Sequence, residues 1–89
     1  MAAAVIEELT ALGATITQDD AAAALGAGCN NIVATFAGTV DGGTPICLCA
    51  HLDTVPNSGP IDVVVRDGFL TNANDDILGG DNKSAVAAI

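Results

Sequence analysis

The sequence has few of the large side chains that fill a protein core. Aromatic residues make up 2% of its 89 residues, with no tryptophan or tyrosine, although 51% of the residues are hydrophobic. Most of the hydrophobic residues are alanine or valine, which bury little area each. A chain this short also has an unfavourable ratio of surface to volume. We therefore expect at most one domain, and we do not expect these residues to form a self-sufficient folding unit.

Basic residues are almost absent as well. Arg66 and Lys83 stand against eleven acidic residues, which gives a net charge of −9. A chain with this balance repels nucleic-acid phosphates and anionic lipid headgroups, so we expect neither nucleic acid nor a membrane surface as a partner. Clustered carboxylates favour multivalent cations, because a cation among them relieves their mutual repulsion.

Signals for membrane insertion and secretion are also missing. No apolar run approaches the length of about 18 residues that suggests a membrane-spanning helix. The N-terminus has no basic region, and Glu7 and Glu8 interrupt its apolar stretch, which argues against a signal peptide. Cys29, Cys47 and Cys49 are odd in number and match neither a zinc ribbon nor a disulfide framework. We expect a cytoplasmic protein in a reducing environment.

Hydrophobic spacing predicts an α/β chain. Helices are expected over residues 2–12 and 82–89. Strands are expected over residues 14–18, 32–36, 46–50, 61–66 and 69–71. The connecting segments are expected to be turns or loops at residues 19–30, 37–45 and 72–80, with a hairpin turn at Asp67-Gly68.

The apolar run ICLCA at residues 46–50 predicts a strand that is buried on both faces of a helix-covered sheet. The first predicted helix begins without a capping residue, and the last predicted helix reaches Ile89 without a residue that usually ends a helix. We therefore expect part of a larger α/β domain that is truncated at both ends.

The single histidine, His51, directly follows this predicted strand. Open α/β sheets bind ligands at the carboxyl ends of their strands. Asp53 lies two residues further on, and on a continuing strand its side chain would project on the same side. A histidine beside a carboxylate is typical of a metal site, although a lone histidine at a strand end is more often structural.

A second group of polar residues begins with two glycines, in the sequence ILGGDNKS at residues 77–84. Asp81 precedes the predicted last helix, where a carboxylate can cap the helix N-terminus. The same carboxylate can instead bridge two metal ions with its two oxygens. The residues alone leave both interpretations open.

Taken together, HLDTVP at residues 51–56 and ILGGDNK at 77–83, separated by a predicted strand pair, resemble a known family. It is the zinc exopeptidase family of peptidase T, glutamate carboxypeptidase, aminoacylase and succinyl-diaminopimelate desuccinylase. Residues 31–34 and the turn at 38–45 add to the resemblance, which spans roughly residues 5 to 89. It implies a three-layer α/β/α catalytic domain with a mixed, largely parallel sheet, of which residues 1–89 are the N-terminal portion.

The resemblance also implies roles for individual residues. His51 would bind one zinc ion, Asp53 would be the catalytic-site carboxylate that orients His51, and Asp81 would bridge two zinc ions. The peptide bond from Asp81 to Asn82 would be cis. Many relatives have aspartate at position 82, and asparagine there removes a charge without removing a ligand. Co²⁺ or Mn²⁺ would also suit these ligands.

The family completes its site with a glutamate pair, a further acidic ligand and a second histidine, which would all follow Ile89. Glu7 and Glu8 lie on the first predicted helix and do not replace them. The full-length protein is therefore expected to be a homodimeric metallopeptidase that cleaves short peptides, as peptidase T does. Alternatives are an N-acyl amino acid deacylase of the same family and a non-catalytic metal-binding or interaction module. These residues alone are expected to be inactive.

Other metal sites fit the sequence less well. Residues 74–82 are similar to one calcium-binding nonapeptide repeat, but that architecture needs several stacked copies. No EF-hand loop occurs. Cys47 and Cys49 share a predicted strand face with His51, yet they are interpreted as small buried hydrophobic residues. Asp75 and Asp76 are interpreted as solvated loop carboxylates.

Overall fold

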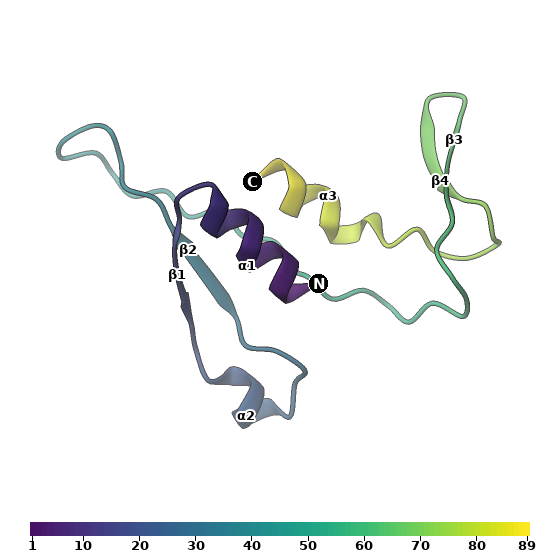
Figure 1. Ribbon diagram of the computed structural model, residues 1–89, viewed down its shortest axis with the longest axis horizontal. Coiled ribbons are helices and arrows are strands. Elements are labelled where there is room, and N and C mark those ends of the chain that lie inside the picture. Colours follow the sequence, from purple (N-terminus) through teal and green to yellow (C-terminus); the bar gives the residue numbers. More distant parts are fainter. The chain divides into compact units, whose positions relative to one another are not determined.

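A computed structural model describes residues 1–89, which divide into two compact units, Met1–Ile46 and Cys47–Ile89. The first unit contains α1 (Ala2–Ala11), β1 (Thr15–Gln18), α2 (Ala21–Leu25) and β2 (Ile32–Thr35). The second contains β3 (Val63–Arg66), β4 (Phe69–Asn72) and α3 (Gly80–Ala88) (Figure 1). The chain is therefore mixed α/β, as the sequence predicts. No helix has the length and apolar character needed to cross a bilayer.

The first unit is a two-stranded antiparallel sheet against which α1 packs. Ile16 of β1 lies opposite Ala34 of β2, and both are half-buried. On α1, Val5, Ile6 and Leu9 are half-buried as well, and the helix contacts both strands. The spacing of these three residues places them on one side of the helix. The predicted helix and both predicted strands of this unit are thus confirmed, with ends that differ by one residue.

Helix α2 lies within residues 19–30, where the sequence predicts no regular element, so that prediction is wrong. One Asp19 oxygen accepts hydrogen bonds from the amides of Ala21 (3.1 Å) and Asn31 (3.0 Å), and the Asn31 side chain donates to the other oxygen (2.7 Å). These bonds lower the pKa of Asp19, and the bond from the Asn31 side chain has the largest effect. Gly26 ends the helix with a φ of 65°. An aspartate before an alanine run and a glycine after it are helix signals that the sequence does contain.

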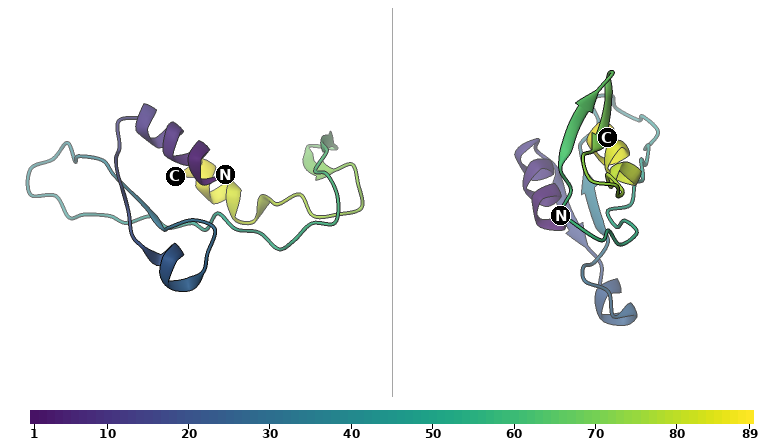
Figure 2. Two further views of the ribbon diagram at one scale, coloured as in Figure 1. Left: turned by 60° about the horizontal axis from the view of Figure 1, so that its bottom comes forward. Right: turned by 90° about the vertical axis from the view of Figure 1, so that its right-hand side faces the viewer.

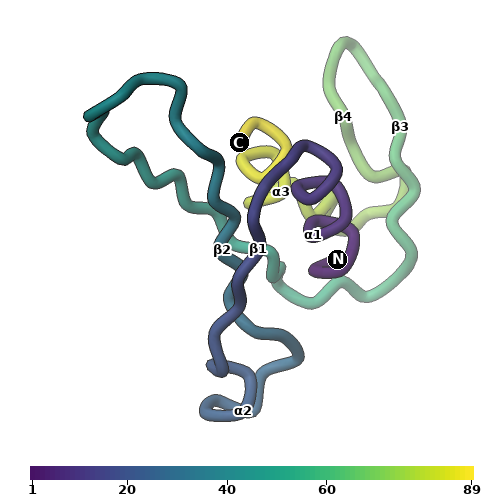
Figure 3. The backbone as a smooth tube through the Cα atoms, turned by 60° about the vertical axis from the view of Figure 1, so that its left-hand side comes forward, coloured from purple at the N-terminus to yellow at the C-terminus, as the bar shows by residue number.

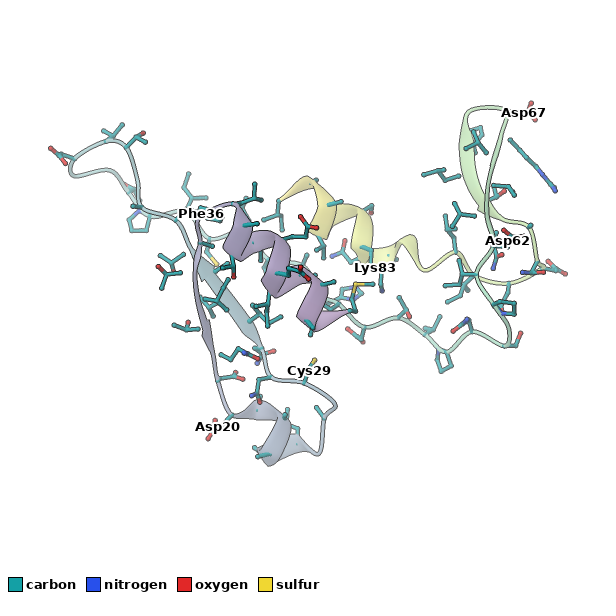
Figure 4. All side chains as sticks on the ribbon, viewed as in Figure 1. Asp20, Cys29, Phe36, Asp62, Asp67 and Lys83 are labelled. Atoms are coloured by element: carbon teal, nitrogen blue, oxygen red, sulfur yellow. The ribbon has the colours of Figure 1, made fainter.

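The second unit contains the hairpin of β3 and β4. Val65 lies opposite Leu70, and Arg66 lies opposite Phe69. Asp67 and Gly68 have φ angles of 51° and 82°, the positive values that a two-residue type I′ turn needs at both positions. The predicted hairpin turn is therefore confirmed. Figure 3 shows the narrow loop, and Figure 4 labels Asp67 at its tip.

The buried strand predicted at residues 46–50 is wrong. These residues form no strand, and the side chains of Ile46 and Leu48 are 86% and 65% exposed. Cys47 and Cys49 are exposed rather than buried. A strand requires a neighbour that pairs with its backbone, and no strand pairs with this run. Both sheets of the chain are two-stranded and antiparallel, so the predicted parallel sheet does not form in these residues.

Neither unit buries a side chain completely. Large hydrophobic residues that a core would normally enclose are exposed, among them Leu12, Phe36 and Phe69. Apolar burial usually supplies most of the free energy that stabilises a fold. The elements of this chain therefore depend strongly on hydrogen bonds within the two sheets, the helices and the loops.

The hairpin turn provides a direct test of this local stabilisation. Because Gly68 has a φ of 82°, we expect Gly68→Ala to destabilise the hairpin by about 1–2 kcal/mol, the cost of a left-handed conformation for a residue with a Cβ. The intensity of the cross-strand NOEs between Val65 and Leu70 should fall. Gly59→Ala is the control, because a Cβ there meets no atom within 4 Å. Equal NOE intensities in the two variants would contradict the expectation.

Candidate functional site

Two extended segments flank the hairpin in the second unit and run side by side (Figures 1 and 2). Residues 51–58 precede the hairpin, and residues 76–79 follow it and lead into α3. The amide and hydroxyl groups of Ser58 donate to Asp76 Oδ2 at 2.6 Å and 2.8 Å. At the other end, Lys83 Nζ donates to the carbonyl of Leu52 at 3.0 Å. These two contacts join the segments near the hairpin and near α3.

Asparagine side chains connect the base of the hairpin to the returning segment. Asn72 Oδ1 accepts a hydrogen bond from the Asp62 amide (3.0 Å), and Asn72 Nδ2 donates to the Ile77 carbonyl (3.0 Å). Asn74 Nδ2 donates to the carbonyl of Pro60 at 2.9 Å. Asn72 therefore joins the end of β4 to the residues that lead toward Asp81.

His51 lies between two aspartates. Its Nε2 atom is 3.2 Å from Asp81 Oδ1, and its Nδ1 atom is 3.2 Å from Asp53 Oδ1. Nδ1 is also 3.0 Å from the backbone carbonyl oxygen of Asp53. Residues 51–53 form no strand, so the sequence prediction of a shared strand face is wrong. The nearness of His51 and Asp53 instead results from an extended, unpaired segment.

The three side chains line a shallow pocket of about 350 Å³ in the second unit. The other lining residues are Thr54, Val55 and Ile77. The side chain of His51 is 51% exposed, and those of Asp53 and Asp81 are 90% and 93% exposed. The polar atoms of the pocket are thus accessible to ions and small molecules from solvent.

The backbone at the start of α3 directs Asp81 toward this pocket. Gly79 has a φ of 77°, a value that favours glycine, and Asp81 and Asn82 have non-helical backbone angles. Asp81 makes no side-chain capping bond to α3, so the capping interpretation of this residue is not supported. The peptide bond between Asp81 and Asn82 is cis, which confirms the expectation taken from the resemblance.

The contacts of His51 have an electrostatic consequence. A neutral imidazole has one N–H donor and one nitrogen lone pair. Nδ1 faces two oxygens of Asp53, so the neutral tautomer that satisfies them carries its proton on Nδ1. The Nε2 lone pair then faces the Asp81 carboxylate at 3.2 Å. In this tautomer, a cation between the two electron-rich atoms would be attracted to both.

The donor pair fits a zinc ion in chemistry and spacing. Ligand distances of about 2.0–2.2 Å in a tetrahedral site place two donor atoms about 3.3–3.6 Å apart. The separation of His51 Nε2 and Asp81 Oδ1 is 3.2 Å. No group of three or more histidine, cysteine, aspartate or glutamate side chains is arranged to hold a metal. This pair therefore supplies two possible metal donors and not a complete ligand set.

The structure brings together all three residues that the sequence singles out, His51, Asp53 and Asp81. Cys47 and Cys49 are free thiols and do not belong to this group.

Glu7 and Glu8 are exposed on α1 in the other unit, as predicted. Asp76, interpreted from the sequence as a solvated carboxylate, instead accepts hydrogen bonds from Ser58 and from the Ile77 amide (2.7 Å). The contact of Lys83 with Leu52 was not predicted, and the only signal in the sequence is the rarity of basic residues.

Comparisons with known proteins give one relative. The chain is 33% identical over 78 residues to the uncharacterized protein YqjE of Bacillus subtilis (strain 168). The match covers 88% of this chain and 21% of the relative, so the chain spans about a fifth of the length of the curated protein it matches. No family model matches the chain. No solved structure matches it either.

The Ser58–Asp76 contact should depend on pH. Hydrogen bonds to the Asp76 carboxylate lower its pKa below the ordinary value of 3.8, and the bond from the Ser58 side chain has the largest effect. Because the folded-state pKa is depressed, the stabilisation is present above pH 3.8 and is lost as the pH falls through the lowered pKa. We expect the Ser58 amide resonance to shift over that range in an NMR titration. Asp76→Asn should abolish the shift and the control Asp75→Asn should retain it, whereas a shift that persists in Asp76→Asn would contradict the assignment.

Proposed function

We propose that His51 and Asp81 are ligands of a divalent metal, preferentially zinc, in a hydrolase that cleaves amide bonds. The observation that carries the proposal is the 3.2 Å separation of His51 Nε2 and Asp81 Oδ1, with Nδ1 already occupied by Asp53. The net charge of −9 supports a cation as the occupant. The resemblance of residues 51–56 and 77–83 to the zinc exopeptidases supports the same metal and reaction class.

Each of the three residues has a distinct task in this proposal. His51 binds the metal through Nε2, while Asp53 holds the ring through Nδ1 and increases its basicity. Asp81 contributes one oxygen beside His51 and has a second oxygen for a neighbouring ion. When bound, the metal pair polarises an amide carbonyl and activates water. The Thr54, Val55 and Ile77 side chains line the pocket beside these donors.

The rest of the protein would complete both the fold and the site. We propose that residues 1–89 are the N-terminal portion of a three-layer α/β/α catalytic domain with a mixed, largely parallel sheet. The exposed side chains of Leu12, Phe36 and Phe69 support this, because other segments of such a domain would cover them. The two donors present here support it as well, since catalytic zinc usually has three protein ligands.

The proposed substrate is a short peptide, as for peptidase T, and the proposed whole protein is a cytoplasmic homodimer. An N-acyl amino acid would present the same amide bond to the same metal pair, so a deacylase of this family is the second candidate. A non-catalytic metal-binding module is the third, and the presence of only two suitably placed donors is the observation that favours it.

Zinc binding to the chain tests the proposal. We expect His51→Ala and Asp81→Asn each to weaken Zn²⁺ affinity, measured by isothermal titration calorimetry, by at least about 10-fold, because loss of even a residue behind the ligands costs that much. Asp75→Asn is the matched control, since it removes the same unit of charge outside the pocket. An affinity equal in all four proteins would show that zinc binds the acidic surface and would reject the proposed ligands.

A further inference from the structure

Besides the contact of Asp81 with His51, Lys83 makes a second side-chain contact between α3 and the segment that carries His51 and Asp53. Its Nζ atom donates to the carbonyl oxygen of Leu52 at 3.0 Å across a separation of 31 residues, and the contact is partly buried. Figure 4 labels Lys83 near the start of α3. The lysine therefore connects two parts of the chain that are distant in sequence and adjacent in the second unit.

The acceptor of this bond lies in sequence between two residues that line the pocket. The Leu52 carbonyl belongs to the peptide group that joins Leu52 to Asp53, and His51 is the residue before it. Lys83 itself is two residues beyond Asp81. This hydrogen bond thus joins the backbone that carries His51 and Asp53 to the helix that carries Asp81.

The charge of Lys83 is not used in an ion pair. The two ion pairs of the structure both involve His51, and Lys83 takes part in neither. Its partner is a neutral carbonyl, although Asp53 directly follows Leu52 and Asp81 lies two residues before Lys83. The ammonium thus contacts this segment at the Leu52 carbonyl and makes no ion pair with Asp53 or Asp81.

We propose that Lys83 is a positioning residue for the metal site, because its hydrogen bond to Leu52 holds His51 and Asp81 at the separation that a bound metal requires. This inference rests on the proposed function. The direction in which cation affinity changes when Lys83 is replaced distinguishes a positioning role from an effect of charge. By charge alone, removal of an ammonium group near the site should strengthen the binding of a cation. Removal of a positioning contact should weaken it.

The test compares Lys83→Met, which removes the donor and keeps a long side chain, with Lys83→Arg, which keeps a donor. Zn²⁺ affinity by calorimetry should fall about 10-fold in Lys83→Met, as for residues that orient metal ligands, and Lys83→Arg should restore most of it. Arg66→Met removes the other basic side chain, at the hairpin end of β3, and should leave affinity unchanged or slightly stronger. Unchanged or stronger binding in Lys83→Met would overturn the inference.

A second measurement does not depend on zinc. The ¹³C resonance of the Leu52 carbonyl and the amide resonances of residues 51–53 should shift in metal-free Lys83→Met and should return toward the wild-type values in Lys83→Arg. Circular dichroism checks that helix content is retained. If these resonances do not move, the inference fails even where zinc binding is as proposed. If they move while His51→Ala leaves zinc affinity unchanged, the contact positions the segment but the proposed metal site is rejected.

Discussion

A chain that buries no side chain must be held in shape by hydrogen bonds, and in the second unit these come largely from polar side chains to backbone groups. Asp76 holds Ser58, Asn72 holds the Ile77 carbonyl, and Lys83 holds the Leu52 carbonyl. Each of these bonds gains only modest net free energy because water competes for the same groups. Together they hold the outgoing and returning segments side by side, and the arrangement of the pocket depends on that pairing.

The exposure of the pocket also determines its electrostatics. Asp53 and Asp81 are almost fully exposed, so water screens their attraction to any single charged partner. An exposed carboxylate gains little from a distant ammonium group, but a multivalent ion bound directly to its oxygen displaces the intervening water. The position of His51 between two carboxylates is therefore better suited to direct coordination of a cation than to long-range attraction. The spacing of the donor atoms is therefore stronger support for the proposed metal ligands than the net charge of the chain is.

The features that short-range interactions determine were the ones predicted best from the sequence. The turn at Asp67-Gly68 follows from the positive φ angles that these residues tolerate, and the first helix follows from its spacing of apolar residues. The strand at residues 46–50 was wrong because an apolar run shows only that a segment can be buried, and pairing needs a second strand. Helix α2 was missed although an aspartate precedes it and Gly26 ends it, whereas the contact of Asp19 with Asn31 joins residues 12 apart and is not visible in local patterns. His51, Asp53 and Asp81 were singled out by their positions in the sequence and by resemblance, whereas the distances between them are set by the folded chain and are not encoded by residue spacing.

The two basic residues of this acidic chain differ in exposure and in the contacts that their charged groups make. Arg66 ends β3 at the tip of the hairpin, where its side chain is exposed. Lys83 is half-buried near the carboxylates, and it nevertheless donates to a neutral carbonyl. A lysine has a long, flexible stem and a compact charged head with three donors, so it can reach a distant carbonyl while its charge stays partly hydrated. The observed contribution of Lys83 is therefore a hydrogen bond between two segments of the chain, and its charge is not paired with a carboxylate.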